Sequence, residues 1–294
     1  MRRIFVFLPK EDTLSQRSNM KLYFKCPVCG ELLTGEKTLA CKNNHCFDVA
    51  RQGYVNLLRS NQASGKRHGD DALMVKARTA FLDRGYYSCL LDGITEQLDE
   101  FLGERAVIAD LGCGECWYTS KIYSHLTESG RDTGIYGIDI SKTALISGAK
   151  RCRELNLAVG SIAALPIPDG SCNAVLSVFA PYNAAEVLRI TEPGGYFIKV
   201  VPLERHLIEL KSVIYDNPYE NKAELENLPG FELVMQTRVE KKLLIDSAED
   251  ISNLFKMTPY YYKTGRDDQQ KINSLTSLET TAQFLIETFV KVKN

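Results

Sequence analysis

Residues 106–122 read AVIADLGCGECWYTSKI, and this stretch decides how the chain folds. Its first four residues are apolar and lead to Asp110, a run that is typical of a strand buried on both faces of a parallel sheet. Gly112 and Gly114 then predict a turn before a helix, and such a turn lets backbone amides approach a bound cofactor closely. A dinucleotide-binding turn would place a third glycine at position 117, where this chain has Trp117. The stretch therefore disfavours a dinucleotide site.

The turn resembles the S-adenosylmethionine site of Rossmann-like methyltransferases, which carry an acidic residue, here Asp110, beside the first glycine. Two further marks support the likeness: Asp139 ends the next expected strand, and EPGGYFIKV (192–200) resembles the Pro-Gly-Gly turn before the fifth strand of that class. The class usually has a third glycine where Cys116 stands. The alternative is a tight turn with no ligand. The resemblance implies a donor site made of Asp110, Gly112, Cys113, Gly114, Glu115, Tyr118, Asp139, Ile140, Ser161 and Ile162.

The rest of the chain after the turn alternates short apolar segments with helix-length ones. Strands separated by helices imply right-handed crossovers and a mostly parallel sheet. A strand-like segment at 231–245, a helix at 247–257 and a last apolar run at 282–292 are expected to complete the sheet edge. The fold class predicted is α/β, a Rossmann-like methyltransferase domain over residues 105–294. The parallel strands are expected at 106–110, 135–139, 155–161, 174–180 and 196–201.

A cluster of cysteines lies near the start of the chain, in CPVCGELLTGEKTLACKNNHC (26–46). Cys26 and Cys29 form one pair and Cys41 and His45 a second, which is the spacing of a structural zinc site. Cys46 is a rival fourth ligand. Four protein ligands leave no open coordination position, so the ion is expected to stabilise a small module and not to catalyse a reaction. A disulfide is disfavoured because no signal sequence precedes the cluster, and a redox pair because a second pair accompanies the first.

The domain organisation follows from these segments. We expect residues 1–19 to form a disordered extension, residues 20–60 the zinc-binding module, and residues 61–104 a linker and a helical segment before the methyltransferase domain at 105–294. Residues 1–87 contain 15 lysines and arginines against 8 aspartates and glutamates, although the whole chain has a net charge of −1. A basic front end suits a nucleic-acid partner or, equally, a solvated lysine-rich surface.

No apolar run approaches the roughly 20 residues that a membrane-spanning helix needs. The apolar stretch after the first two arginines is also shorter than the apolar core of a secretory signal. We therefore expect a cytoplasmic protein with no membrane partner.

The order of the zinc module and the methyltransferase domain resembles the family of large-subunit ribosomal RNA guanine N1-methyltransferases. The likeness extends from about Phe24 and rests on CPVC, CKNNH, FDVARQGYVNLL, GDDALMVKARTAFLDRGYY, DLGCGE, FAPYNAAEVLRITEPGG, PLERHLIELKSVIY and MTPYYYK. It implies a homodimer whose zinc modules help to grip a ribosomal RNA hairpin, and transfer of the donor's methyl group to N1 of a guanine.

The target base must leave any stack to be reached, and this fold places it after the fourth strand. The candidates for the base pocket are Phe179, Pro181, Tyr182 and His206, with no proton acceptor identified. Stacking on RNA is a possible role for residues 260–262. Candidate phosphate contacts are Arg51, Lys66, Arg67, Lys76 and Arg78.

Two alternative functions stay open from the sequence. One is a methyltransferase that acts on a small molecule or a protein. The other is a non-catalytic RNA-binding or ribosome-assembly factor that retains the fold. Measuring S-adenosylmethionine binding separates the non-catalytic factor from both kinds of methyltransferase. Comparing RNA with small-molecule and protein acceptors separates the two kinds of methyltransferase.

Overall fold

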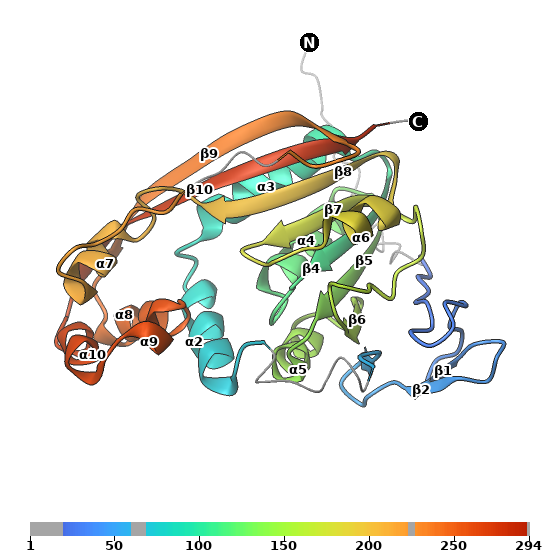
Figure 1. Cartoon of the computed structure of the whole chain (residues 1–294), viewed down its shortest axis with the longest axis horizontal. Helices are drawn as coiled ribbons and strands as arrows, with labels where there is room; N and C mark the ends of the chain where they lie inside the picture. Colours follow the sequence, from blue (N-terminus) through green and yellow to red (C-terminus); the bar gives the residue numbers. More distant parts are fainter. Residues whose placement is uncertain (1–19, 60–68, 223–226, 293–294) are drawn as a thin grey trace, which may run out of the picture.

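The computed structural model describes residues 20–59, 69–222 and 227–292. The expected extension at 1–19, together with Lys66 and Arg67, lies outside these residues. An eight-stranded sheet runs through the molecule, in the order β3-β6-β5-β4-β7-β8-β10-β9 (Figure 1). Its strands are β3 (Tyr54–Asn56), β4 (Arg105–Leu111), β5 (Asp132–Asp139), β6 (Asn156–Val159), β7 (Cys172–Val178), β8 (Thr191–Pro202), β9 (Phe231–Ile245) and β10 (Leu278–Lys291).

The middle of the sheet is parallel and its far edge is antiparallel. Neighbouring strands from β3 to β8 pair in parallel, whereas β10 pairs antiparallel with both β8 and β9. The central strands β4 and β5 are buried along almost their whole length, as their unbroken apolar runs require. This topology confirms the predicted Rossmann-like fold with a mostly parallel sheet. The C-terminal strands complete the sheet edge as expected, and their antiparallel direction is a finding of the structure.

Helices cover the two faces of the sheet and one end of it. Three of them, α3, α4 and α5, pack on one face, whereas α6 lies against β8 on the other. The C-terminal helices α8, α9 and α10 gather with α7 beyond one end of the sheet, beside α2 (Figure 1). The helices are α2 (Ala72–Asp83), α3 (Ser88–Phe101), α4 (Trp117–Glu128), α5 (Lys142–Arg151), α6 (Ala184–Ile190), α7 (Ile208–Ile214), α8 (Ala248–Lys256), α9 (Tyr260–Lys263) and α10 (Arg266–Asn273).

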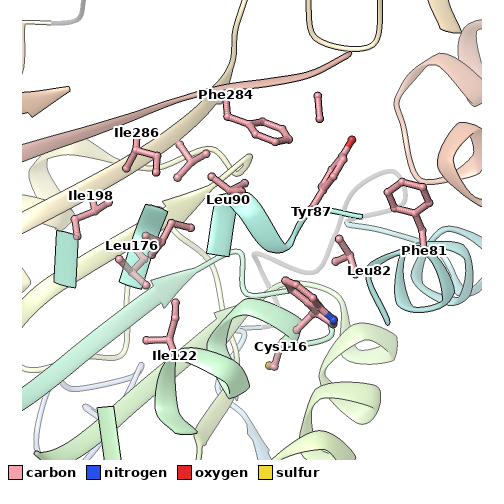
Figure 2. Packing of buried hydrophobic residues seen from close by; sticks show 14 of the residues in the cluster. Phe81, Leu82, Tyr87, Leu90, Cys116, Ile122, Leu176, Ile198, Phe284 and Ile286 are labelled. Carbon is pink, nitrogen blue, oxygen red and sulfur yellow. The ribbon is translucent and has the colours of Figure 1, made fainter. Parts of the chain in front are cut away.

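An aromatic cluster joins the helices to the sheet on the first face. The ring of Tyr87 lies 5.3 Å from that of Phe81 and 5.0 Å from that of Phe284, in edge-to-face contacts (Figure 2). Phe81 comes from α2 and Phe284 from β10, so Tyr87 connects a helix to the antiparallel edge of the sheet. Contacts of this geometry add to the burial energy of the rings.

The zinc-binding region packs against the opposite face of the sheet. A ribbon of β1 (Thr38–Ala40) and β2 (Cys46–Asp48) forms its outer part. The Phe24 ring lies 5.4 Å from the ring of Tyr136 on β5, and the Tyr136 hydroxyl donates to the backbone oxygen of Tyr23 at 2.9 Å. The Lys25 N–H donates to the Pro166 carbonyl at 2.9 Å. The region is therefore docked on the sheet and is not a loosely tethered module.

Strand β3 carries this docking further, because it belongs to the large sheet. Tyr54, Val55 and Asn56 pair in parallel with residues 157–159 of β6. The predicted boundary at residue 60 therefore lies beyond a strand of the larger domain. A strand of three residues is too short for sequence periodicity to assign to either unit.

No helix in the described parts of the chain is both long and apolar enough to cross a membrane.

Candidate functional site

A cavity of about 1010 Å³ opens at the carboxyl ends of the parallel strands. Ligands of open α/β sheets commonly bind at this edge. We call the part formed after β4, β5 and β6 the β4–β6 wall, and the part formed after β7 and β8, with residues of the C-terminal helices, the β7–β8 wall. The β4–β6 wall contains Asp110, Gly112, Cys113, Gly114, Glu115, Tyr118, Asp139, Ile140, Ser161 and Ile162. All ten residues predicted for the donor site thus line one cavity.

The glycine turn of the β4–β6 wall needs its glycines. Gly112 and Gly114 have φ values of 73° and 55°, in the left-handed region that glycine adopts readily. A Cβ at position 112 would lie 2.5 Å from the side chain of Ala180, on the segment after β7. The turn therefore brings β4 and the β7 segment close together, and a larger residue would separate them.

Cys116 replaces the third glycine without entering the cavity. It has a φ of 59°, also left-handed, and it is completely buried. Its Sγ points toward α5, where a Cβ at Gly148 would lie only 2.5 Å away. The departure from the usual glycine pattern is accommodated by a second glycine, 32 positions along the chain in α5.

Asp139 is held by the turn and by the start of the next helix. Its Oδ2 accepts the Gly114 N–H at 2.8 Å, and its Oδ1 accepts the Ser141 N–H at 2.7 Å. Burial raises its pKa, and these two N–H groups oppose that effect. Each carboxylate oxygen has a lone pair left, so the side chain can still accept hydrogen bonds from a ligand in the cavity.

Asp110 lies deeper, at the end of β4. Its Oδ2 accepts the Thr119 hydroxyl at 2.5 Å. Burial, helped by the nearby charges of Asp139 and Glu115, raises the pKa of Asp110 to about 7 against the opposing hydrogen bond from Thr119. A carboxyl group of this kind changes charge near neutral pH.

Arg78 lies over the glycine turn, a position for Arg78 that the sequence did not indicate. It projects from α2, where its Nε donates to Glu115 Oε2 at 2.8 Å and its Nη2 forms a short ion pair with Asp70. The Asp70 carbonyl in turn accepts the Ser141 hydroxyl at 2.9 Å. Arg78 was expected to contact phosphate, but in this structure two carboxylates bind it.

Three buried donors at the cavity lack partners. The hydroxyls of Tyr87 and Tyr118 and the indole N–H of Trp117 have no hydrogen-bond partner among the described residues. All three residues line the cavity. A buried donor left unsatisfied costs free energy on the order of 1–3 kcal/mol. These groups therefore favour a polar ligand, and they fit a donor molecule that carries a carboxylate, a ribose and a purine.

The β7–β8 wall includes three of the four residues predicted for the base pocket. Phe179, Pro181 and His206 line it. Phe179 has a φ of 56°, unusual for a large side chain, and the residue stays 44% exposed. Tyr182 instead packs its ring 4.8 Å from that of Phe197, which belongs to the opposite face of the sheet. The left-handed Phe179 redirects the chain, which the strand's alternation could not predict.

His206 is neutral in this wall. Its Nδ1 accepts the Gln283 N–H at 3.2 Å, so the ring proton resides on Nε2. Burial, together with the charge of Lys211, lowers the pKa of His206 to about 3. The imidazole is therefore a hydrogen-bond donor through Nε2 and a very weak base.

The other aromatic and basic candidates are spread more widely. Tyr260 lines the cavity, whereas the exposed Tyr262 donates its hydroxyl to Asp71 at 2.7 Å. Arg51 and Lys76 are exposed on the surface. Apart from Tyr260, the structure does not bring these residues together with the cavity.

The cysteine cluster forms a closed set of four ligand atoms. The side chains of Cys26, Cys29, Cys41 and His45 place one sulfur or nitrogen each within 4.8 Å of one another. Sγ of Cys29 lies 3.7 Å from Sγ of Cys41, and His45 Nδ1 lies 3.4 Å and 3.6 Å from the sulfurs of Cys41 and Cys26.

These separations fit a tetrahedral zinc ion. Bonds of about 2.3 Å to sulfur and 2.0–2.1 Å to nitrogen separate neighbouring ligand atoms by about 3.5–3.8 Å. Cys46 is exposed and directs its sulfur to the Asn44 carbonyl at 3.5 Å, so His45 completes the set. Hydrogen bonds, the strongest of them from the Glu31 N–H, lower the pKa of Cys29 to about 6, which favours the thiolate that a metal binds.

Comparison with known proteins matches both parts of the chain. Residues 24–66 match the family model described as RlmA, N-terminal, a zinc ribbon, and residues 108–195 match a methyltransferase domain. A 23S rRNA (guanine(748)-N(1))-methyltransferase of Streptomyces fradiae is 35% identical over 238 residues, which cover 78% of this chain and 82% of that protein.

Two further relatives carry related names. A Bacillus subtilis (strain 168) protein provisionally named a 23S rRNA (guanine-N(1)-)-methyltransferase is 30% identical over 271 residues, 88% of this chain and 93% of that protein. A Micromonospora griseorubida protein with the same provisional name is 32% identical over 209 residues, 64% of this chain and 68% of that protein.

Proposed function

The chain belongs to the family of 23S rRNA (guanine-N1)-methyltransferases, and on that premise we propose that it transfers a methyl group from S-adenosylmethionine to N1 of a guanine in a hairpin of large-subunit ribosomal RNA. The observation that carries the proposal is that one cavity joins the glycine turn to an aromatic wall. Such a cavity can hold a donor and a flipped base together. Bound S-adenosylmethionine supplies a methyl group on a sulfonium, which passes in line to a nucleophile.

The β4–β6 wall is the proposed donor site. Asp139 accepts the ribose hydroxyls through its remaining lone pairs, while the Gly114 N–H keeps the carboxylate in place. The unpaired O–H and N–H groups of Tyr87, Trp117 and Tyr118 then donate hydrogen bonds to acceptor atoms of S-adenosylmethionine. Because proximity and alignment contribute most of the catalysis in such transfers, these contacts act mainly by fixing the donor's orientation.

The β7–β8 wall is the proposed guanine site. The exposed ring of Phe179 offers a stacking surface for a base that has left its helix. Guanine N1 has a pKa of about 9, so loss of its proton needs an acceptor or stabilisation of the anion. With a pKa of about 3, His206 is too weak a base to hold that proton. We assign it to donation from Nε2 toward the guanine carbonyl oxygen, where negative charge develops.

The zinc-binding module at residues 20–60 is the proposed grip on the RNA. Its docking on the sheet through Phe24 and Lys25 gives it a fixed position relative to the cavity. The excess of basic residues at 1–87 favours a phosphate-rich partner. We further propose a homodimer that acts in the cytoplasm without a membrane partner, so that two modules grip one hairpin. The relatives' names do not favour a small-molecule or protein acceptor, or a purely non-catalytic role.

The test is transfer of labelled methyl from S-adenosylmethionine to unmodified 23S ribosomal RNA, followed by reverse transcription. A methyl on guanine N1 blocks the pairing edge, so we expect label in the RNA and a donor-dependent stop at one guanine. Labelled RNA without a reverse-transcription stop would mean that an atom other than guanine N1 is methylated. A zinc-loaded protein that binds the donor but labels no RNA, free or in ribosomal particles, would overturn the proposal.

A further inference from the structure

A lysine is buried behind the β7–β8 wall. Lys211 of α7 has no exposed surface. Its Nζ donates to the Tyr219 carbonyl at 3.1 Å and to Asn221 Oδ1 at 2.9 Å, and it lies 4.6 Å from the ring centroid of Tyr219 and 5.6 Å from that of Tyr260. Among the described residues no carboxylate forms an ion pair with it.

This arrangement is costly for the folded protein. Burial lowers the pKa of Lys211, and the charge of nearby Glu220 offsets the effect only in part. Aromatic faces and two oxygens compensate for some of the lost hydration. A buried charge that lacks an opposite charge is nevertheless often less stable than an apolar side chain of the same length. Packing alone therefore does not explain why a lysine stands here.

What Lys211 holds is the segment that follows α7, residues 215–221. Asn221 is also fixed from the other side, since its Nδ2 donates to the Leu203 carbonyl at 2.7 Å and its N–H to the Glu204 carbonyl at 3.0 Å. Tyr219, by contrast, makes a single hydrogen bond among the described residues, which its carbonyl accepts from Lys211, and the residue is 49% exposed. Its ring lies 5.9 Å from that of Tyr215 and 6.3 Å from that of Tyr260. Tyr219 and Asn221 both line the cavity, beside His206.

We propose that Tyr219 stacks on a nucleotide of the acceptor RNA and that Lys211 is the positioning residue that holds its ring in the wall. The inference rests on the proposed function and deepens it, because it assigns an acceptor contact outside the segment after β7. An exposed ring on a cavity wall is the usual surface on which proteins stack splayed-out bases. The ammonium beneath the ring and the bond to its carbonyl fix the ring without occupying its exposed side.

The experiment compares Lys211→Met, Tyr219→Leu and Tyr219→Phe, with Lys242→Met as the control because Lys242 is exposed on β9. For each variant, calorimetry gives the donor Kd, filter binding without donor gives the RNA Kd, and a methylation assay gives KM for RNA and kcat. We expect Lys211→Met and Tyr219→Leu each to weaken RNA binding and raise KM for RNA about tenfold, with the donor Kd unchanged. Tyr219→Phe, which keeps the ring, should restore the wild-type values.

Two further readouts separate positioning from folding. The double variant Lys211→Met, Tyr219→Leu should be no worse than either single one, since both remove the same surface. The melting temperature of Lys211→Met should equal or exceed that of the wild type. Wild-type RNA affinity in Lys211→Met or in Tyr219→Leu, or an equal loss of donor and RNA affinity, would overturn the inference. Failure of the wild type itself to label RNA would overturn the proposed function instead, while the RNA-binding comparison still decides the inference.

Discussion

The sulfur of Cys116 occupies the space that a side chain at Gly148 would need. An ideal Cβ at position 148 would lie 2.5 Å from Sγ and 3.1 Å from Cβ of Cys116. The two residues belong to the cofactor turn and to the interior of α5, so each fixes the other's size. Cys116, which stands where the turn usually has its third glycine, can be accommodated because position 148 in the helix is a glycine.

Gly148→Ala is therefore expected to destabilise the protein by about 1–3 kcal/mol through overpacking, although alanine is the better helix former. Urea denaturation measures the loss. Adding Cys116→Gly should recover much of it, because glycine adopts the left-handed conformation at 116 without strain. Gly103→Ala is the control, since no atom lies within 4 Å of a Cβ there. Equal effects at positions 103 and 148 would contradict the packing argument.

The zinc site predicts a sharp difference between neighbouring cysteines. Cys41→Ser should abolish stoichiometric zinc and lower the melting temperature, because structural zinc contributes on the order of 10 kcal/mol to a small module. Cys46→Ser should leave both unchanged, since that thiol lies outside the ligand set. Metal analysis and thermal unfolding, with and without a chelator, measure the two effects. Zinc loss in Cys46→Ser would mean that His45 is not the fourth ligand.

Replacing the carboxylate of Asp139 beside the glycine turn is expected to weaken the binding of S-adenosylmethionine. Asp139→Asn places an amide where the carboxylate accepts two backbone N–H groups, so the donor Kd should rise about 10- to 100-fold, the cost of one to two charge-assisted hydrogen bonds. Calorimetry with S-adenosylmethionine measures it. Asp267→Asn, an exposed change in α10, should bind as the wild type does. Unchanged affinity in Asp139→Asn would remove Asp139 from the proposed donor site.

Asp110 predicts a pH dependence of stability. Its folded pKa of about 7 lies above the ordinary aspartate value of 3.8, so the folded state binds more protons between these values. Stability is therefore lost as pH rises from about 4 to 7, at up to ~1.4 kcal/mol per pH unit. Asp110→Asn keeps an acceptor for Thr119 and removes the titration. Its free energy of unfolding relative to wild type should increase from pH 4.5 to pH 7.5; a constant difference would contradict the raised pKa.

The sequence was informative where a single chemical requirement, such as close approach of a cofactor or binding of a metal, determines several nearby residues at once. The buried strand before Gly112, the acidic residue after the second strand, and the two ligand pairs at 26–45 all belong to this kind, and the structure brings each group together. Tyr182 was less predictable, because a single left-handed residue before it changes the face of the sheet that it meets. Arg78 and Lys211 were not predictable as part of the site, since their partners lie elsewhere in the chain and such side-chain contacts leave no periodic signal.

Strand β3 makes the front of the chain inseparable from the rest. It caps the open edge of β6, so a truncation that began at Ala72 would leave the N–H and C=O groups of residues 157–159 without their neighbours. An exposed strand edge of this sort invites pairing with another chain. Attempts to produce the catalytic half alone should therefore yield aggregates, and any two-piece version of this enzyme must keep residues 54–56 on the same fragment as β6.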